Sequence, residues 1–129
     1  MPARDHELAT ARRAERGQAT VEFALLLPVL VLALLAVLQV ALVVRDQVAV
    51  VHAAREAARA ASVDPDPGRA ERVAHRTLPG ASVHVGARPA VGEPIAVEVT
   101  YTSKTDLPLV GALFPDPELQ SKVVMRVEK

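Results

Sequence analysis

The sequence predicts a membrane-anchored α+β protein, in which a long N-terminal transmembrane helix extends outside the membrane and packs on a small antiparallel sheet. Two observations support this prediction. Residues 23–44 form an almost unbroken apolar run, with Gln39 as its only polar residue. Residues 95–101 alternate between apolar and polar side chains, which is the pattern of a strand with one buried face.

The composition limits the kinds of protein that this chain can be. Its 129 residues leave room for one membrane segment and one small domain. The formal net charge is zero, which gives no support for a nucleic-acid partner. There is no cysteine, so disulfides are excluded and a metal site would lack its commonest soft ligand. Because only 2% of the residues are aromatic, a soluble core must consist of Val, Leu and Ala.

Residues 23–44 are long enough to cross a lipid bilayer. At about 1.5 Å per residue, the run makes a helix of about 33 Å, close to the thickness of the hydrocarbon core. A soluble domain of this size could not bury a helix that is apolar on every side. We therefore predict a transmembrane helix over residues 18–44, with a kink at Pro28 because proline lacks an amide hydrogen.

The segment before the apolar run, residues 1–17, is polar and carries several arginines. Arg12, Arg13 and Arg16 lie directly before the run, as is usual for an end that stays in the cytoplasm. The sequence therefore predicts a single-pass protein with its N-terminus inside and its C-terminal domain outside the cytoplasmic membrane.

Three interpretations of this segment are open. A secretory signal has an apolar region of about 7–15 residues that ends at a small-residue cleavage site, which is shorter than this run. An uncleaved anchor explains the length and the charges but not Glu22, since a carboxylate costs about 2.5–3.5 kcal/mol at mid-membrane and less near an interface. The third interpretation is a precursor whose leader ends at Gly17.

The order of residues supports the third interpretation. A basic leader ends in Gly17, four residues of modest polarity follow, and Glu22 and Phe23 precede the apolar helix. This order resembles the processing site of prepilin-like proteins, and residues 16–28 (RGQATVEFALLLP) resemble the start of TadE-like proteins of the tight-adherence pilus system.

This resemblance implies a pseudopilin or minor pilin with a pilin-like fold, in the bacterial cytoplasmic membrane and in some cases in a surface pilus. It implies that a prepilin peptidase cuts between Gly17 and Gln18. Besides the peptidase and the lipid bilayer, the implied partners are other pilin-like subunits and the pilus assembly machinery.

Glu22 has a chemical role available to it if the leader is removed. Cleavage would create an α-amine at Gln18 with a pKa of about 7.7–8.0. That cation and the Glu22 carboxylate lie one helical turn apart, so they can pair within a chain or between neighbouring chains. The resemblance assigns Glu22 and Phe23 to assembly and to the register of packed helices. The alternative is a glutamate that only extends toward the membrane interface.

The helix is expected to continue past the membrane, from about residue 19 to residue 61, because no helix breaker occurs before residues 64–68. In residues 45–61 the polar side chains gather on one side and small apolar side chains lie opposite. The polar side comprises Arg45, His52, Arg55, Glu56 and Arg59, and the apolar side comprises Ala49, Val50, Ala53, Ala57, Ala60 and Ala61.

Two interpretations of Arg55, Glu56 and Arg59 are open. Residues 53–59 (AAREAAR) also resemble TadE-like sequences, which favours a face that docks other subunits. The alternative is a solvated face with a weak Glu56–Arg59 ion pair. His52 has only Glu56 as a neighbouring ligand one turn away, so no metal site is expected.

Residues 62–129 are predicted to form a small α+β extracytoplasmic domain. Residues 69–78 are expected to form a short amphipathic helix, and strands are expected at residues 81–87, at residues 95–101 and from Leu119 or Ser121 to Val127. Residues 106–115 form an apolar loop that is expected to be buried against the sheet rather than presented to lipid or to a partner. A domain this small without disulfides should depend on helix residues 45–61 for its core.

No catalytic motif occurs in the sequence. There is no Gly-rich phosphate loop and no pattern typical of a nucleophile or a zinc site, and the four histidines are scattered. We expect no enzymatic activity, no cofactor and no small-molecule substrate. The rival to the pseudopilin is an uncleaved single-pass membrane protein with a small extracytoplasmic binding domain.

Overall fold

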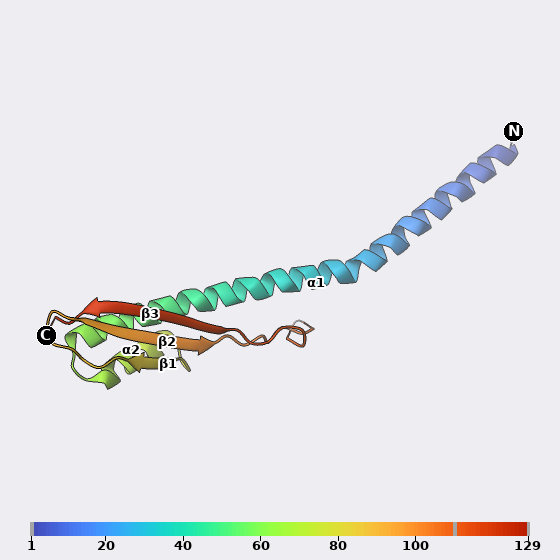
Figure 1. The fold of residues 1–129 in the computed structure, drawn as a ribbon. Coiled ribbons are helices and arrows are strands. Elements are labelled where there is room, and N and C mark those ends of the chain that lie inside the picture. The colour runs from blue at the N-terminus through green and yellow to red at the C-terminus, as the bar shows by residue number, and fades with distance from the viewer. Residues whose placement is uncertain (1, 110, 129) are drawn as a thin grey trace. The chain divides into compact units, whose positions relative to one another are not determined.

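The computed structural model describes residues 2–109 and 111–128, with side chains described from Gly17 onward. It contains α1 (Pro2–Val63), α2 (Pro67–Thr77), β1 (Ser82–Val85), β2 (Pro94–Thr102) and β3 (Glu118–Arg126), as Figure 1 shows. This confirms the predicted fold class, a long apolar N-terminal helix packed on a small antiparallel sheet. The side chains of the predicted leader before Gly17 lie outside the described residues. The chain divides into two compact units, residues 1–38 and residues 39–129.

The part of α1 in the first unit exposes a continuous apolar surface. From Gly17 to Leu38 every side chain is exposed except that of Leu35, which is half-buried. The helix continues through Pro28 without a break. A soluble protein rarely exposes so large a continuous apolar surface, and the helix is long and apolar enough to cross a membrane.

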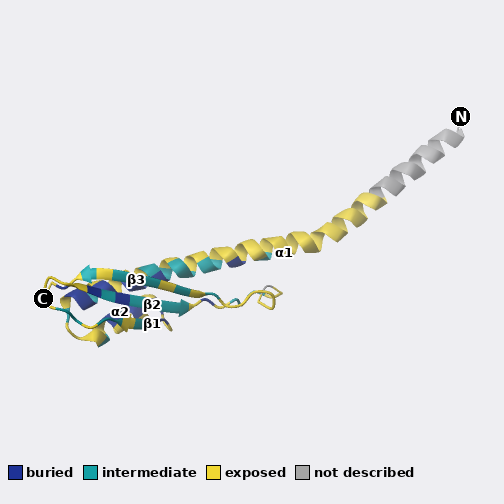
Figure 2. Cartoon of the chain, in the orientation of Figure 1, coloured by how far each residue is buried: buried dark blue, intermediate teal, exposed yellow. Residues whose placement is uncertain are grey.

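The part of α1 in the second unit has one buried face. Its buried apolar side chains recur every three or four residues and comprise Val50, Ala53, Ala54, Ala57, Ala58 and Ala61. They share one core with side chains of β2, in the region of dark blue residues in Figure 2. The polar residues predicted on the opposite side are all exposed. The domain therefore shares its core with this helix, as predicted.

α2 begins two residues earlier than the predicted range of residues 69–78. Asp66 caps it, because its Oδ1 accepts a 2.9 Å hydrogen bond from the amide of Gly68, and Pro67 takes the first helical position. Ala70 and Ala74 are buried in the shared core. α2 therefore lies on the same side of the sheet as α1.

The three strands form an antiparallel sheet in the order β1-β2-β3. Val99 lies opposite Val83 of β1, and Val97 lies opposite Val123 of β3, so these side chains share the face that meets the helices. In β2 the buried residues are Ile95, Val97 and Val99. The predicted alternation over residues 95–101 is confirmed.

The expectation that residues 106–115 are buried is wrong for the described residues, 106–109 and 111–115. They form the tip of the hairpin between β2 and β3, where Leu109, Leu113 and Phe114 are 65%, 72% and 57% exposed. The core face of the sheet is already covered by α1 and α2, so the tip extends past the end of the sheet. Its backbone folds on itself, because Gly111 donates a 3.0 Å hydrogen bond to the carbonyl of Leu107.

Candidate processing and assembly site

Gly17 lies in α1 at an open position. Among the described residues, no atom lies within 4 Å of the position that a Cβ would occupy, apart from the helix's own nearby backbone and the adjacent residues. A glycine inside a helix costs about 0.5–1 kcal/mol relative to alanine. Packing within the described part of the chain therefore gives no reason for glycine at this position.

Gln18 and Glu22 are in contact across one turn of α1. The Gln18 Nε2 donates a 3.0 Å hydrogen bond to Oε1 of Glu22, and both side chains are exposed. Phe23 follows and is 63% exposed. The structure thus places residue 18 within reach of the Glu22 carboxylate, at the border between the polar segment and the apolar run.

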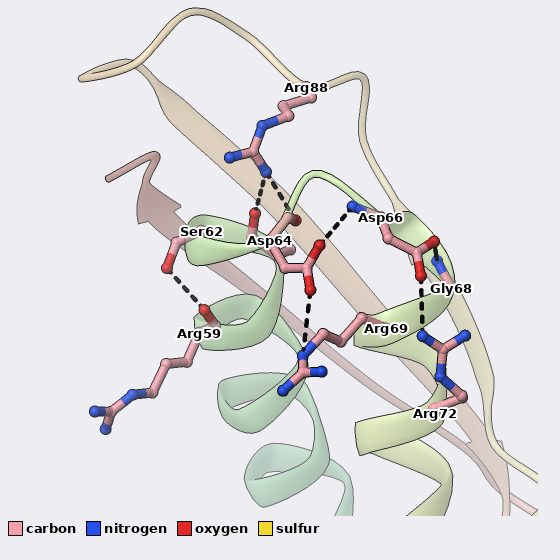
Figure 3. Close-up of polar contacts among 9 residues, drawn as sticks. Arg59, Ser62, Asp64, Asp66, Gly68, Arg69, Arg72 and Arg88 are labelled. Atoms are coloured by element: carbon pink, nitrogen blue, oxygen red, sulfur yellow. Dashed lines mark hydrogen bonds and ion pairs between the residues drawn. The ribbon is translucent and has the colours of Figure 1, made fainter. Parts of the chain in front are cut away.

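The predicted docking residues Arg55, Glu56 and Arg59 all lie on the exposed side of α1. Glu56 and Arg59 line a depression of about 530 Å³ between α1 and α2, whose other walls include Val63 and Arg69. The Glu56–Arg59 ion pair of the alternative interpretation does not form between these two described residues. Figure 3 shows the guanidinium of Arg59 pointing away from the neighbouring polar contacts.

The junction between α1 and α2 is held by polar contacts. Arg88 donates from Nη1 to the carbonyl of Ala61 at 2.6 Å and to that of Asp64 at 3.0 Å, which satisfies the C-terminal end of α1 (Figure 3). The Asp64 carboxylate pairs with Arg69 at 3.4 Å. Local sequence does not reveal the partner of a helix end that lies more than twenty residues away.

Asp66 combines a helix cap with an ion pair. The hydrogen bond from Arg72 at 2.9 Å, followed by that from the Gly68 amide, lowers the pKa of the Asp66 carboxyl from its ordinary value of 3.8. The signal for the cap was visible in the sequence as Asp66-Pro67-Gly68, because aspartate before proline is a frequent helix start.

The described side chains include no group of three or more His, Asp or Glu residues that could hold a metal ion. His52 lies on the exposed side of α1, away from the other histidines of the domain in sequence. The chemistry that the site offers is therefore that of a peptide bond beside Gly17, a carboxylate at Glu22 and an apolar helix surface.

A long apolar helix whose C-terminal part packs on a small antiparallel sheet fits the class of membrane-anchored, pilin-like α+β proteins. The model of the family described as TadE-like protein matches residues 17–59, about a third of the chain, which confirms the resemblance seen in the sequence. Neither the curated proteins nor the solved structures that were searched gave a match.

The matched segment contains the apolar run, Gly17, Glu22 and the three predicted docking residues. The match indicates a pilus-associated, minor-pilin-like protein. Among the described residues, one helix is long and apolar enough to cross a membrane. Such a family is structural rather than enzymatic.

Proposed function

We propose that this chain is a pseudopilin or minor pilin that acts in the assembly of a tight-adherence type IV-like pilus, after a prepilin peptidase removes residues 1–17. The observation that carries the proposal is the contact between residue 18 and Glu22 across one turn, directly after a glycine that packing does not require. A glycine before the scissile bond leaves that bond unobstructed by a side chain.

Removal of the leader changes the electrostatics of this turn. The new α-amine at Gln18 is a cation at neutral pH, and it starts one helical turn from the Glu22 carboxylate. Pairing with a neighbouring chain offsets the cost of a carboxylate at the membrane edge and sets the axial register of the packed helices, with Phe23 beside it. The exposed apolar surface after Phe23 then packs against other pilin-like subunits.

Arg55, Glu56 and Arg59 provide a second docking surface in this proposal. They are exposed outside the apolar run, and two of them border the depression between α1 and α2. The C-terminal domain lies outside the cytoplasmic membrane and the leader lies inside, where the basic residues before Gly17 retain it.

The deciding experiment identifies the first residue of the mature chain. The full chain is co-expressed with a prepilin peptidase and extracted from the membrane, and its intact mass is measured. Co-expression with a catalytically inactive peptidase is the control. A mature chain that begins at Gln18 only with the active peptidase supports the proposal. A chain that retains its leader in both cases contradicts it and favours the uncleaved single-pass binding protein.

A further inference from the structure

We propose that the tip of the β2–β3 hairpin, described at residues 106–109 and 111–116, is a second membrane contact that inserts its apolar side chains into the lipid leaflet beside α1. The proposal requires that the apolar run be embedded in lipid. It does not depend on removal of the leader or on assembly into a pilus.

Two hydrogen bonds place the hairpin along α1. Ser103 donates from Oγ to Oδ2 of Asp46 at 2.6 Å, and Gln39 donates from Nε2 to Oγ1 of Thr105 at 3.3 Å. From Ser103 to Thr105 the hairpin therefore passes from the level of Asp46 to the level of Gln39, about two helical turns nearer the N-terminus of α1.

This direction leads into the membrane. Arg45 and Asp46 are the first charged residues after the apolar run. Gln39 lies about 9 Å before Arg45 along the helix axis, inside the apolar run. Asp116 accepts a 2.8 Å hydrogen bond from the amide of Thr105 at its Oδ1, and Asp106 directly follows Thr105, so two carboxylates lie at this level. The tip therefore starts at the headgroup boundary, and its apolar residues follow from there.

The side chains of the tip suit that depth. No charged residue occurs from Leu107 to Pro115, and charged residues flank the tip at Lys104, Asp106 and Asp116. Among the described residues of the tip, the large exposed side chains are Leu109, Leu113 and Phe114. Apolar side chains that enter the boundary between headgroups and acyl chains, with charges left at the surface, are typical of interfacial membrane contacts.

A depression between the tip and α1 continues the apolar surface of the helix. It has a volume of about 350 Å³, and its lining is almost entirely apolar: Val40, Val43 and Val44 of α1 face Phe114, Pro115 and Pro117 of the hairpin. Because the valines belong to the apolar run, a lipid acyl chain that covers the run also covers this depression.

Gln39 supplies an independent observation. It is the only polar residue of the apolar run, yet its side chain is only 7% exposed, and Thr105 is its hydrogen-bond partner. Its Oε1 is buried and has no partner among the described residues. The hairpin thus covers an amide that would otherwise face lipid, where an uncovered polar group is costly.

The chain contains no tryptophan, so Phe114→Trp creates a single fluorescent reporter at the tip. The full-length variant is reconstituted into phosphatidylethanolamine–phosphatidylglycerol vesicles with and without brominated acyl chains. The control is Val91→Trp, which replaces a 66% exposed residue between β1 and β2. We expect blue-shifted emission at position 114 and several-fold stronger quenching by the brominated lipid than at position 91.

Two results overturn the proposal. One is a tip reporter that behaves like the control and is quenched by aqueous acrylamide but not by brominated lipid. The other is blue-shifted emission without bromolipid quenching, because the tip is then buried against protein, such as a second copy of the chain. If Phe114→Trp fails to fold by circular dichroism, Leu113→Trp at the same tip serves as the reporter. Uncleaved protein is used throughout, so failure of this proposal is separate from failure of processing.

Discussion

Ser103 Oγ donates a 2.6 Å hydrogen bond to Oδ2 of Asp46, joining the end of β2 to α1 across 57 positions of sequence. Ser103 is 1% exposed, and the Asp46 side chain is 22% exposed. A hydrogen bond to a partly buried carboxylate is stronger than one between neutral groups. The contact sets the position of the hairpin along the helix, because the hairpin can slide along α1 only by breaking it.

Ser103→Ala is expected to destabilise the domain. The substitution leaves the Asp46 carboxylate without this donor, and loss of a hydrogen bond to a charged group costs about 1.5–3 kcal/mol. Thermal or denaturant unfolding of the full chain in detergent micelles measures the change. The control is Ser82→Ala, at an exposed position of β1. Equal stabilities of the two variants would show that the Ser103–Asp46 contact contributes nothing measurable.

Ala57→Leu is expected to disrupt the contact between α1 and the sheet. Ala57 is fully buried, so a larger side chain must push the helix from the strands, and such overpacking costs about 1–3 kcal/mol. The same unfolding measurement applies, with Ala90→Leu at an exposed position as the matched control. A variant as stable as the control would mean that the packing of α1 on the sheet is looser than described.

Glu22→Gln is expected to leave membrane insertion intact and to abolish assembly with partner pilins. The amide keeps the shape of the side chain but cannot form an ion pair with a cationic N-terminus at Gln18. Fractionation reports insertion, and cross-linking or pilus recovery reports assembly. Glu71→Gln on the exposed side of α2 is the matched control. Normal assembly of the Glu22 variant refutes the role in register.

Asp66→Asn is expected to lower the melting temperature at neutral pH but not in strong acid. Asparagine keeps a capping oxygen but loses the ion pair with Arg72. Since the folded protein lowers the pKa of Asp66, the carboxylate stabilises the fold above the ordinary value of 3.8, and this contribution is lost as the pH falls through the lowered pKa.

Melting curves recorded from neutral pH to well below pH 3.8 compare Asp66→Asn with the unaltered chain. The difference in melting temperature should be constant near neutral pH and should vanish well below pH 3.8. Asp106→Asn is the control, since Asp106 is exposed in the hairpin tip. A difference that persists unchanged into acid would mean that the charge of Asp66 is not involved.

The sequence by itself determined the elements whose signals are local. The apolar run predicts the membrane helix, because its surface can be covered only by lipid or by other apolar helices. The alternation in residues 95–101 predicts a half-buried strand. The helix breakers in residues 64–68 predict the end of α1, and in the structure α1 ends at Val63. Periodicity and turn chemistry depend on neighbours in sequence, so they can be read without a structure.

The tertiary structure alone decided what depends on distant partners. Composition favoured a buried loop at residues 106–115, but the helices already cover the core face of the sheet, so the loop is exposed. The contacts of Asp46 with Ser103 and of Arg88 with the end of α1 join residues far apart in sequence. No local pattern predicts such pairs, because they form only when the packing of the helix on the sheet brings their atoms within bonding distance.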